Sequence, residues 1–360
     1  MSNKNTGTAI EAMAALLEDD AVTEIMVNSF DRVFVERQGK LEPAGVYFAD
    51  DQQVLHWANA LLASNGFEAV GPSNPWVERR LRNGDRLVVV TAPIALSGPV
   101  VTVRKFFRKQ MTFEQLLQYG SLSRPILDFL KVVMRAPLNV LVSGSTSSGK
   151  TTFTNMLTEL MPEDQRIVVV EWMNELHVRQ KHVVYLETQS ANVIGDKKIA
   201  MRDLLQLASH MRPDRILVGE LLGDETVEML RLMNTGHEGM VSLIHATSPR
   251  DALSRLEKLA TVAEPSLRLP AIRADIAQAI HLILQIARLD DGSRKVVSVT
   301  EVQGLKGDNI VLQDIFVWEP SGVAENGRLT GAFKATGATP SFAAKLAAIG
   351  LPFPKGLFEA

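Results

Sequence analysis

The sequence predicts an α/β protein in which a small N-terminal α+β domain precedes a larger domain built on an open sheet. The chain has 360 residues, more than one ordinary hydrophobic core accommodates, so two domains are expected. At residues 139–160 an apolar strand pattern, a glycine-containing loop and a helix pattern follow one another, as in a unit of an open α/β sheet. Hydrophobic residues make up 46% and charged residues 22%, values typical of a folded globular chain.

Composition and charge exclude several classes of function. The chain has no cysteine, which excludes disulfides, thiol catalysis and cysteine-ligated zinc. Its net charge of −3 means that the chain has no excess of positive charge, which non-specific binding of nucleic acid would require. No apolar run reaches the ~18 residues that a membrane helix needs, and residues 1–17 lack the apolar region of a secretory signal. We therefore expect a cytoplasmic protein.

Residues 1–124 are expected to form the small α+β domain. Apolar residues at helical spacing predict a helix at 9–17 and another at 51–65, with Gly66 in the position of a C-cap. Strand patterns occur at residues 24–27, 32–36, 85–91 and 100–104.

Basic residues crowd one stretch of this domain. They are Arg79, Arg80, Arg82, Arg86, Arg104, Lys105, Arg108 and Lys109. One interpretation is a solvated face balanced by the acidic residues of the domain. The other is that some of these arginines approach a phosphate group or an anionic membrane surface.

The larger domain, expected at residues 138–330 after a linker at 125–137, contains a phosphate-binding loop. After the strand pattern at 139–143 the chain reads Gly144, Ser145, Thr146, Ser147, Ser148, Gly149, Lys150, Thr151 and Thr152. This is the motif G-x-x-x-x-G-K-[ST], whose glycines let backbone N–H groups turn toward phosphates. Lys150 supplies a mobile charge to the β- and γ-phosphates, and the Thr151 hydroxyl can hold Mg²⁺. A helix from about residue 150 to 160 would direct its positive end at the anion.

Carboxylates at the ends of two other predicted strands would complete a hydrolytic site. The strand at 215–220 ends in Glu220, which can orient magnesium through its water shell. The strand at 166–171 ends in Glu171, and Glu175 lies four residues further along. Either Glu171 or Glu175 could polarise the attacking water, or both could be ordinary loop carboxylates.

The remaining segments supply two histidines and the end of the domain. His245 ends a predicted strand at 240–244 and could contact the γ-phosphate, whereas His237 follows a helix terminus and would compensate its dipole. Further expected elements are helices at 249–259 and 270–287, a hairpin of strands at 295–302 and 310–318, and a C-terminal tail at 331–360 with a short helix at 341–349.

Taken together, these segments resemble the hexameric ATPases of type IV secretion systems, a branch of the secretion-superfamily traffic ATPases. The resemblance covers roughly residues 20–320. It rests on five blocks in order, at 24–28, 144–152, 171–176, 212–220 (R-P-D-R-I-L-V-G-E) and 235–246 (T-G-H-E-G-M-V-S-L-I-H-A). It implies a small N-terminal α+β domain followed by a RecA-type P-loop ATPase domain, with the nucleotide between the domains and six subunits in a ring.

The resemblance also implies roles for individual residues. Glu220 matches the Walker B carboxylate, which with Thr151 would hold Mg²⁺, and Glu175 matches the catalytic base at the end of the family's acidic box. His245 matches the histidine box. Two of the basic residues, Arg86 and Arg104, match first-domain arginines that reach over the phosphates of the bound nucleotide.

The cofactors and partners that the resemblance implies are ATP, Mg²⁺, five further copies of the chain and the proteins of an inner-membrane secretion machinery. Association with the inner membrane would then be peripheral, through those proteins or an anionic phospholipid surface, and no stable nucleic-acid binding is expected. The sequence departs from the family at Trp172, where Asp is usual, and at Leu222, where Arg is usual. Because of these two departures, the family's contacts between subunits are not transferred to this chain in detail.

Three alternatives remain at this stage. Motors of type II secretion or type IV pili are related, but they typically carry a four-cysteine zinc motif that this chain lacks. A nucleic-acid-translocating motor would be expected to have a basic loop with aromatic residues, and the larger domain offers no such cluster. The non-enzymatic alternative is an assembly scaffold in which ATP only locks a ring.

Overall fold

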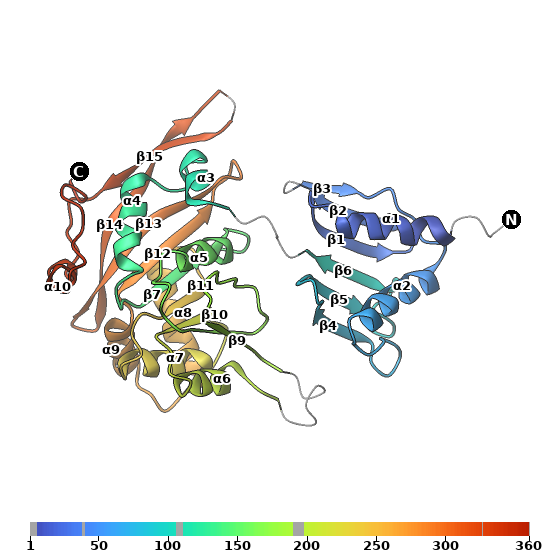
Figure 1. The fold of residues 1–360 in the computed structure, drawn as a ribbon, viewed down its shortest axis with the longest axis horizontal. Coiled ribbons are helices and arrows are strands. Elements are labelled where there is room, and N and C mark those ends of the chain that lie inside the picture. The colour runs from blue at the N-terminus through green and yellow to red at the C-terminus, as the bar shows by residue number, and fades with distance from the viewer. Residues whose placement is uncertain (1–5, 38–39, 106–110, 190–197, 326, 360) are drawn as a thin grey trace. The chain divides into compact units, whose positions relative to one another are not determined.

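The computed structural model describes residues 6–37, 40–105, 111–189, 198–325 and 327–359 (Figure 1). The chain forms two compact units, Met1–Gln110 and Met111–Ala360. The first is a small α+β unit and the second a larger α/β unit, which confirms the predicted fold class. No helix formed by the described residues combines the length and the hydrophobicity of a membrane span.

The first unit is a six-stranded antiparallel sheet in the order β3-β2-β1-β6-β5-β4, with two helices. Its elements are α1 (Thr6–Glu18), β1 (Val22–Ser29), β2 (Arg32–Arg37), β3 (Lys40–Pro43), α2 (Asp51–Ser64), β4 (Trp76–Arg80), β5 (Arg86–Val90) and β6 (Val100–Arg104). The predicted helices and strands of this unit are confirmed, while β3 and β4 are additions. Alternate residues of the strands, such as Ile25, Leu87 and Val101, are buried against apolar residues of both helices.

Helix α2 ends in the way the sequence predicts. Gly66 has a φ of 83°, a left-handed conformation that favours glycine. Its N–H donates to the Ala63 carbonyl at 3.0 Å, and the Phe67 N–H donates to the Leu62 carbonyl at 3.0 Å. These two bonds satisfy carbonyls of the last helical turn, so α2 ends in a Schellman motif.

The second unit is built on a nine-stranded sheet in the order β15-β14-β13-β12-β7-β11-β10-β8-β9. The six strands from β12 to β9 are parallel, and β13 to β15 add antiparallel strands at one side. The elements are α3 (Phe113–Gln118), α4 (Arg124–Val133), β7 (Val140–Gly144), α5 (Lys150–Thr158), β8 (Ile167–Glu171), β9 (Val183–Glu187), α6 (Met201–Ser209), β10 (Arg215–Glu220), α7 (Glu225–Asn234), β11 (Val241–His245), α8 (Pro249–Ala263), α9 (Leu269–Ala279), β12 (Leu282–Arg288), β13 (Arg294–Lys306), β14 (Asn309–Val323), β15 (Leu329–Ala335) and α10 (Ala343–Ala348).

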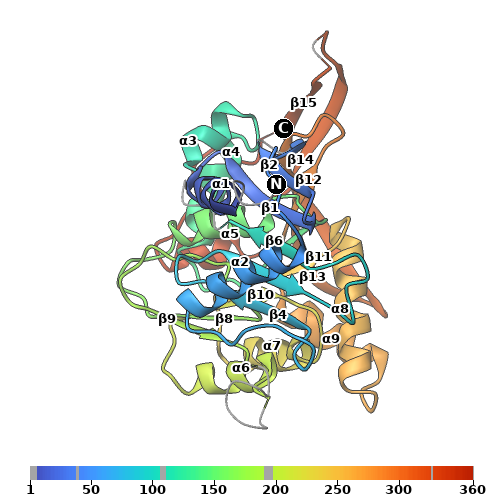
Figure 2. The ribbon, with the colours of Figure 1, turned by 90° about the vertical axis from the view of Figure 1, so that its right-hand side faces the viewer.

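Helices cover both faces of this sheet, which explains the continuous apolar character of its parallel strands. Side chains alternate between the two faces of a strand, so Val140 and Val142 of β7 pack with α3, α4 and α5. Leu141, between them, packs into a second cluster with α6, α7, α8 and α9. The β14–β15 hairpin extends beyond the helices in both views (Figures 1 and 2).

The predicted helix at 270–287 is wrong in its second half. Helix α9 ends at Ala279, and the following residues form β12, which pairs in parallel with β7. The side chains of Leu282, Ile283 and Leu284 are all fully buried because both faces of the strand are covered. A short run that is apolar at every position looks the same in a buried strand and in a buried helix.

The predicted domain boundary near residue 124 and the linker at 125–137 also differ from the structure, which divides the chain after Gln110. The segment in question forms α4, whose residues Ile126, Phe129 and Leu130 are buried in the core of the second unit. Its apolar residues follow helical spacing, so the segment belongs to a core rather than to a connection.

The predicted tail at 331–360 is likewise part of the second unit. Residues 329–335 form the edge strand β15, and the chain then returns over α4. The Glu301 carboxylate, which is 1% exposed, accepts bonds from the Ser341 N–H at 2.8 Å and the Ser341 hydroxyl at 2.5 Å. The rings of Phe353 and Phe129 stack with centroids 5.1 Å apart. These contacts tie the C-terminal segment to the core.

Candidate functional site

The predicted phosphate-binding loop lies where the topology of the sheet favours ligand binding. Strand β7 ends at Gly144 and α5 begins at Lys150, as the sequence predicts. The strands on one side of β7 are β11, β10 and β8, all parallel to it. Their carboxyl ends therefore meet at one edge of the sheet, the usual place for ligands in open α/β folds. The loop and the candidate residues Glu171, Glu220 and His245 all lie at this edge.

The backbone of the loop has the tight curvature that a phosphate cradle requires. Ser147 and Gly149 have left-handed φ values of 59° and 97°. A Cβ on Gly144 would meet the Ser148 hydroxyl and come within 2.5 Å of the Ile286 carbonyl oxygen, so this position requires glycine. The first N–H groups of α5 have no carbonyl partner within the helix. They can therefore bind an anion, which the helix dipole also favours.

The side chain of Lys150 lies inside the curve of the phosphate-binding loop. Its side chain is 8% exposed, and its ammonium donates hydrogen bonds to the carbonyls of Gly144 at 2.9 Å and Ser145 at 3.1 Å. Burial lowers the pKa of Lys150, and the nearby Glu220 and Glu175 carboxylates act in the opposite direction. Both candidate carboxylates thus act electrostatically on the lysine that would bind the β- and γ-phosphates.

Glu220 and His245 lie beside the loop on the two neighbouring strands. His245 pairs with Gly144 in the register of β11 and β7. Its Nδ1 atom lies 3.5 Å from the Thr146 hydroxyl and 3.7 Å from Glu220 Oε1. The register of β10 against β11 shifts between Val218 and Glu220, and such irregularities change the direction of a side chain at an active site. The structure therefore brings Thr146, His245 and Glu220 together.

Glu171 and Glu175 have different environments, which separates their possible roles. The Glu171 side chain is 4% exposed, and its two oxygens accept the N–H groups of Glu175 and Leu176 at 3.1–3.2 Å. A carboxylate held by two backbone donors fixes the conformation of the loop that follows β8. Glu175 is exposed, so its carboxylate is accessible to a water molecule. This geometry favours Glu175 over Glu171 as the base.

The donor set at this edge of the sheet fits magnesium held with its own water molecules. Among the described residues, no three acidic, histidine or cysteine side chains gather closely enough to hold a metal ion by themselves. Mg²⁺ differs from other cations in that it commonly keeps several waters and takes one or two protein ligands together with phosphate oxygens. The Thr151 hydroxyl and the half-exposed Glu220 carboxylate offer such a set.

Three residues that the sequence singled out lie at the margin of the site. His237 follows the end of α7, and its N–H donates to the Leu232 carbonyl at 3.1 Å. Trp172 is 38% exposed beside Lys198, whose ammonium lies 5.9 Å from the centroid of an indole ring. Leu222, two residues beyond Glu220, is 52% exposed.

Arg86 and Arg104 are neighbours on the sheet of the first unit. They pair directly across β5 and β6, and Glu24 pairs with Arg104 from β1. Arg86 forms an ion pair with Glu78 on β4 and donates to it from Nε at 2.6 Å. Of the other basic residues, Arg108 and Lys109 lie outside the described residues.

Residues far away in the sequence also shape the loop, and sequence reasoning missed them. Arg294 donates from Nε to the Ser147 carbonyl at 3.0 Å and lies against Gly149. Gln285, buried on β12, donates to the carbonyl of Ala246 at 3.2 Å, next to His245. No local pattern marks either residue, because each reaches the site only through the pairing of β12 and β13 with the parallel strands.

Comparison with known proteins indicates the family of the chain. The family described as "Type II/IV secretion system protein" matches residues 8–335. A putative conjugal transfer protein of Mycobacterium tuberculosis is 31% identical over 319 residues, which cover 87% of this chain and 88% of that protein. The conjugal transfer protein TrbB of Rhizobium radiobacter is 28% identical over 83% of this chain and 89% of its own.

Among solved structures, the ATPase DotB of Legionella pneumophila has a similar fold. The TM-score is 0.57 at 16% identity, and the match covers 84% of this chain and 82% of DotB. The family match spans both units and includes all five sequence blocks. The chain belongs to the type II/IV secretion system protein family.

Proposed function

We propose that this protein is a Mg²⁺-dependent ATPase motor that works as a hexameric ring and powers transport by a type IV secretion system. The observation that carries the proposal is the gathering of Lys150, Glu220 and His245 at one phosphate-binding loop, with the exposed Glu175 just after β8, the strand next to β10. A binding scaffold needs the loop and its lysine, but it needs no exposed carboxylate placed beside them. We therefore favour an enzyme over a scaffold.

The residues of the site have distinct tasks in hydrolysis. The backbone of residues 144–151 and Lys150 hold the phosphates, with the lysine exchanging its two carbonyl bonds for phosphate oxygens. Thr151 and Glu220 would hold magnesium. When bound, the ion would neutralise negative charge on the β- and γ-phosphates. Glu175 accepts a proton from the attacking water, and His245 contacts the γ-phosphate from the adjacent strand.

The secretion role rests on the relatives. Two of them, from Mycobacterium tuberculosis and Rhizobium radiobacter, are named as conjugal transfer proteins and match more than four fifths of this chain. By this likeness the motor would act with inner-membrane secretion proteins. Its own association with the membrane would be peripheral, through contact with an anionic phospholipid surface. Motors of type II secretion and pili belong to the same family, and the missing cysteines favour the type IV branch.

The first unit would contribute Arg86 and Arg104 to the binding of the nucleotide. Arginine bonds two phosphate oxygens at once through its planar fork, and both arginines project from the rigid strands β5 and β6. We propose that they bind the phosphates of a nucleotide held by the second unit, so that hydrolysis changes how firmly the two units are held together.

Steady-state phosphate release by the purified full chain tests this function. With ATP and Mg²⁺ we expect release that needs no other macromolecule and stops when EDTA removes the metal. Parallel reactions contain single-stranded DNA or vesicles of anionic phospholipid. Release only in the presence of DNA would favour a nucleic-acid-translocating motor, and nucleotide binding without any release would favour the scaffold.

A further inference from the structure

The loop that carries Glu175, at residues 172–182, joins β8 to β9, and these two strands are parallel. The chain between two parallel strands must return from the carboxyl end of the first to the amino end of the second. On this return Leu176, which is fully buried, packs in the same cluster as Phe153 and Leu157 of α5. The loop therefore packs against the helix that begins at the phosphate-binding loop.

Two hydrogen bonds fasten this loop to α5. The His177 N–H donates to Asn155 Oδ1 at 2.8 Å. Further along the loop, the side-chain amide of Gln180 donates to the Thr158 carbonyl. The first bond lies two residues after Glu175 in the chain and the second lies five residues after it, so Asn155 supplies the bond nearer to the candidate base.

The position of Asn155 on the helix relates this bond to the phosphate end of the site. Asn155 follows Thr151 by four residues, so the two side chains lie on the same face of α5, about 6 Å apart along the helix axis. Thr151 lies in the first turn, where the phosphates and magnesium would bind. The bond from His177 therefore holds the loop on the face of α5 that carries Thr151.

A second restraint on the same stretch of backbone comes from β8. The Glu171 carboxylate accepts the N–H groups of Glu175 and Leu176 at 3.1–3.2 Å. The next N–H along the chain, that of His177, is the one that Asn155 accepts. Three successive N–H groups are thus held by side chains from two different elements, which fixes the backbone of Glu175 relative to both the sheet and α5.

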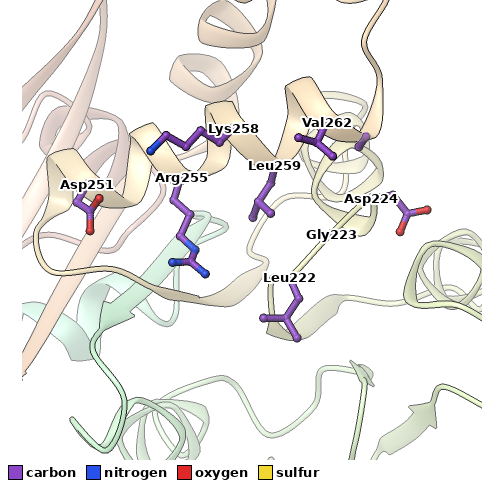
Figure 3. A pocket seen from close by; sticks show the side chains of 9 residues that line it. Leu222, Gly223, Asp224, Asp251, Arg255, Lys258, Leu259 and Val262 are labelled. Atoms are coloured by element: carbon purple, nitrogen blue, oxygen red, sulfur yellow. The ribbon is translucent and has the colours of Figure 1, made fainter.

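The loop that follows β10 is held differently. The Glu225 carboxylate accepts the N–H groups of Leu222 and Gly223 at 2.5 and 2.8 Å, and the outer side of the loop borders an open pocket of about 550 Å³ whose other wall is α8 (Figure 3). Glu220 is the last residue of β10, so the strand itself places it. Glu175 lies four residues beyond its strand, so its position depends on what holds the loop.

We propose that Asn155 is a positioning residue that keeps Glu175 in reach of the attacking water. The inference rests on the proposed ATPase function and on Glu175 as its base. A base acts only within hydrogen-bond reach of the proton that it accepts, and a misplacement of about 1 Å can slow a reaction by about 10²-fold. Without the Asn155 side chain, the loop loses the bond to α5 that lies two residues from Glu175. The chemical step then slows, while the binding of the nucleotide is kept.

Single-turnover phosphate formation from ATP and Mg²⁺, and equilibrium binding of a non-hydrolysable ATP analogue, test the proposal on the full chain. Asn155→Ala and Asn155→Leu both remove the acceptor and should slow phosphate formation by about tenfold or more, while binding of the analogue changes by less than about twofold. Asn155→Asp keeps an acceptor oxygen in the same place and should regain most of the rate. Gln180→Ala removes the other bond between loop and helix and should keep the wild-type rate.

A double variant separates positioning of Glu175 from a general structural role. In the Glu175→Gln background, Asn155→Ala should slow hydrolysis by less than about twofold, because the carboxylate through which it acts is no longer present. A residue that only stabilises the fold would slow hydrolysis by the same factor in both backgrounds.

Three results would overturn the proposal when thermal unfolding shows that the variants are folded. They are a wild-type rate of phosphate formation in Asn155→Leu, an equal slowing by Asn155→Ala with and without the Glu175 carboxylate, and an equal slowing by Gln180→Ala. Each of these results leaves hydrolysis by the wild type intact. Failure of the wild type to hydrolyse ATP would instead contradict the proposed function.

Discussion

The variant Lys150→Ala is expected to lose ATP hydrolysis by a factor on the order of 10³. The lysine is the only cation that the phosphate-binding loop itself contributes, and its ammonium already lies inside the loop on the carbonyls of Gly144 and Ser145. Its removal leaves the charge that develops on the terminal phosphate without this donor, and it also weakens ground-state binding. Steady-state phosphate release at saturating ATP measures the loss.

Two further variants make this result specific. Lys150→Met keeps the buried aliphatic stem, so it separates loss of charge from loss of packing and should be as inactive as the alanine variant. Lys131→Ala removes a half-exposed lysine of the same unit, on α4, and should retain wild-type activity. Turnover of Lys150→Met within a few-fold of the wild type would show that the loop is not the hydrolytic site.

The second large effect is expected for Glu175→Gln, which should still bind ATP and Mg²⁺ but hydrolyse ATP slower by a factor on the order of 10² or more. The amide has nearly the same shape as the carboxylate and cannot accept the proton of the attacking water. Rapid single-turnover measurements of phosphate formation, together with binding of the ATP analogue, separate this loss from a loss of affinity.

Glu171→Gln is the matched comparison four residues away. Glu171 is buried and holds the N–H groups of Glu175 and Leu176, so the variant should lose stability, by about 1–3 kcal/mol, and lose activity only a few-fold. Thermal unfolding and turnover of the two variants are measured side by side. A mild effect of Glu175→Gln together with a large catalytic loss in a stable Glu171→Gln would reverse the assignment of the base.

Local patterns were sufficient to predict most of the fold. The phosphate-binding loop, β8, β10 and β11 were predicted from short apolar runs that end at a polar residue, and Gly66 from the end of an amphipathic stripe. The failures occurred where burial removes the pattern. Strand β12 is apolar at nearly every position because helices cover both of its faces, so nothing in the run itself distinguishes it from a continuation of α9.

The site was predictable where chemistry and local sequence coincide. Lys150, Glu220 and His245 each end or follow a strand, and parallel strands bring such residues together at one edge. The contrast between Glu171 and Glu175 required the structure, because both are glutamates in one loop and only burial separates them. Arg294 reaches the site from β13, whose position depends on the whole sheet, so sequence spacing carries no sign of it.

A structure of the full chain with Mg²⁺ and a non-hydrolysable ATP analogue would show directly where the nucleotide binds. We expect its phosphates to lie within hydrogen-bond distance of the N–H groups of residues 146–151. We also expect the Lys150 ammonium to leave the carbonyls of Gly144 and Ser145 for the β- and γ-phosphate oxygens. A nucleotide bound elsewhere on the chain, or a Lys150 that keeps both carbonyl bonds with the nucleotide present, would contradict this expectation.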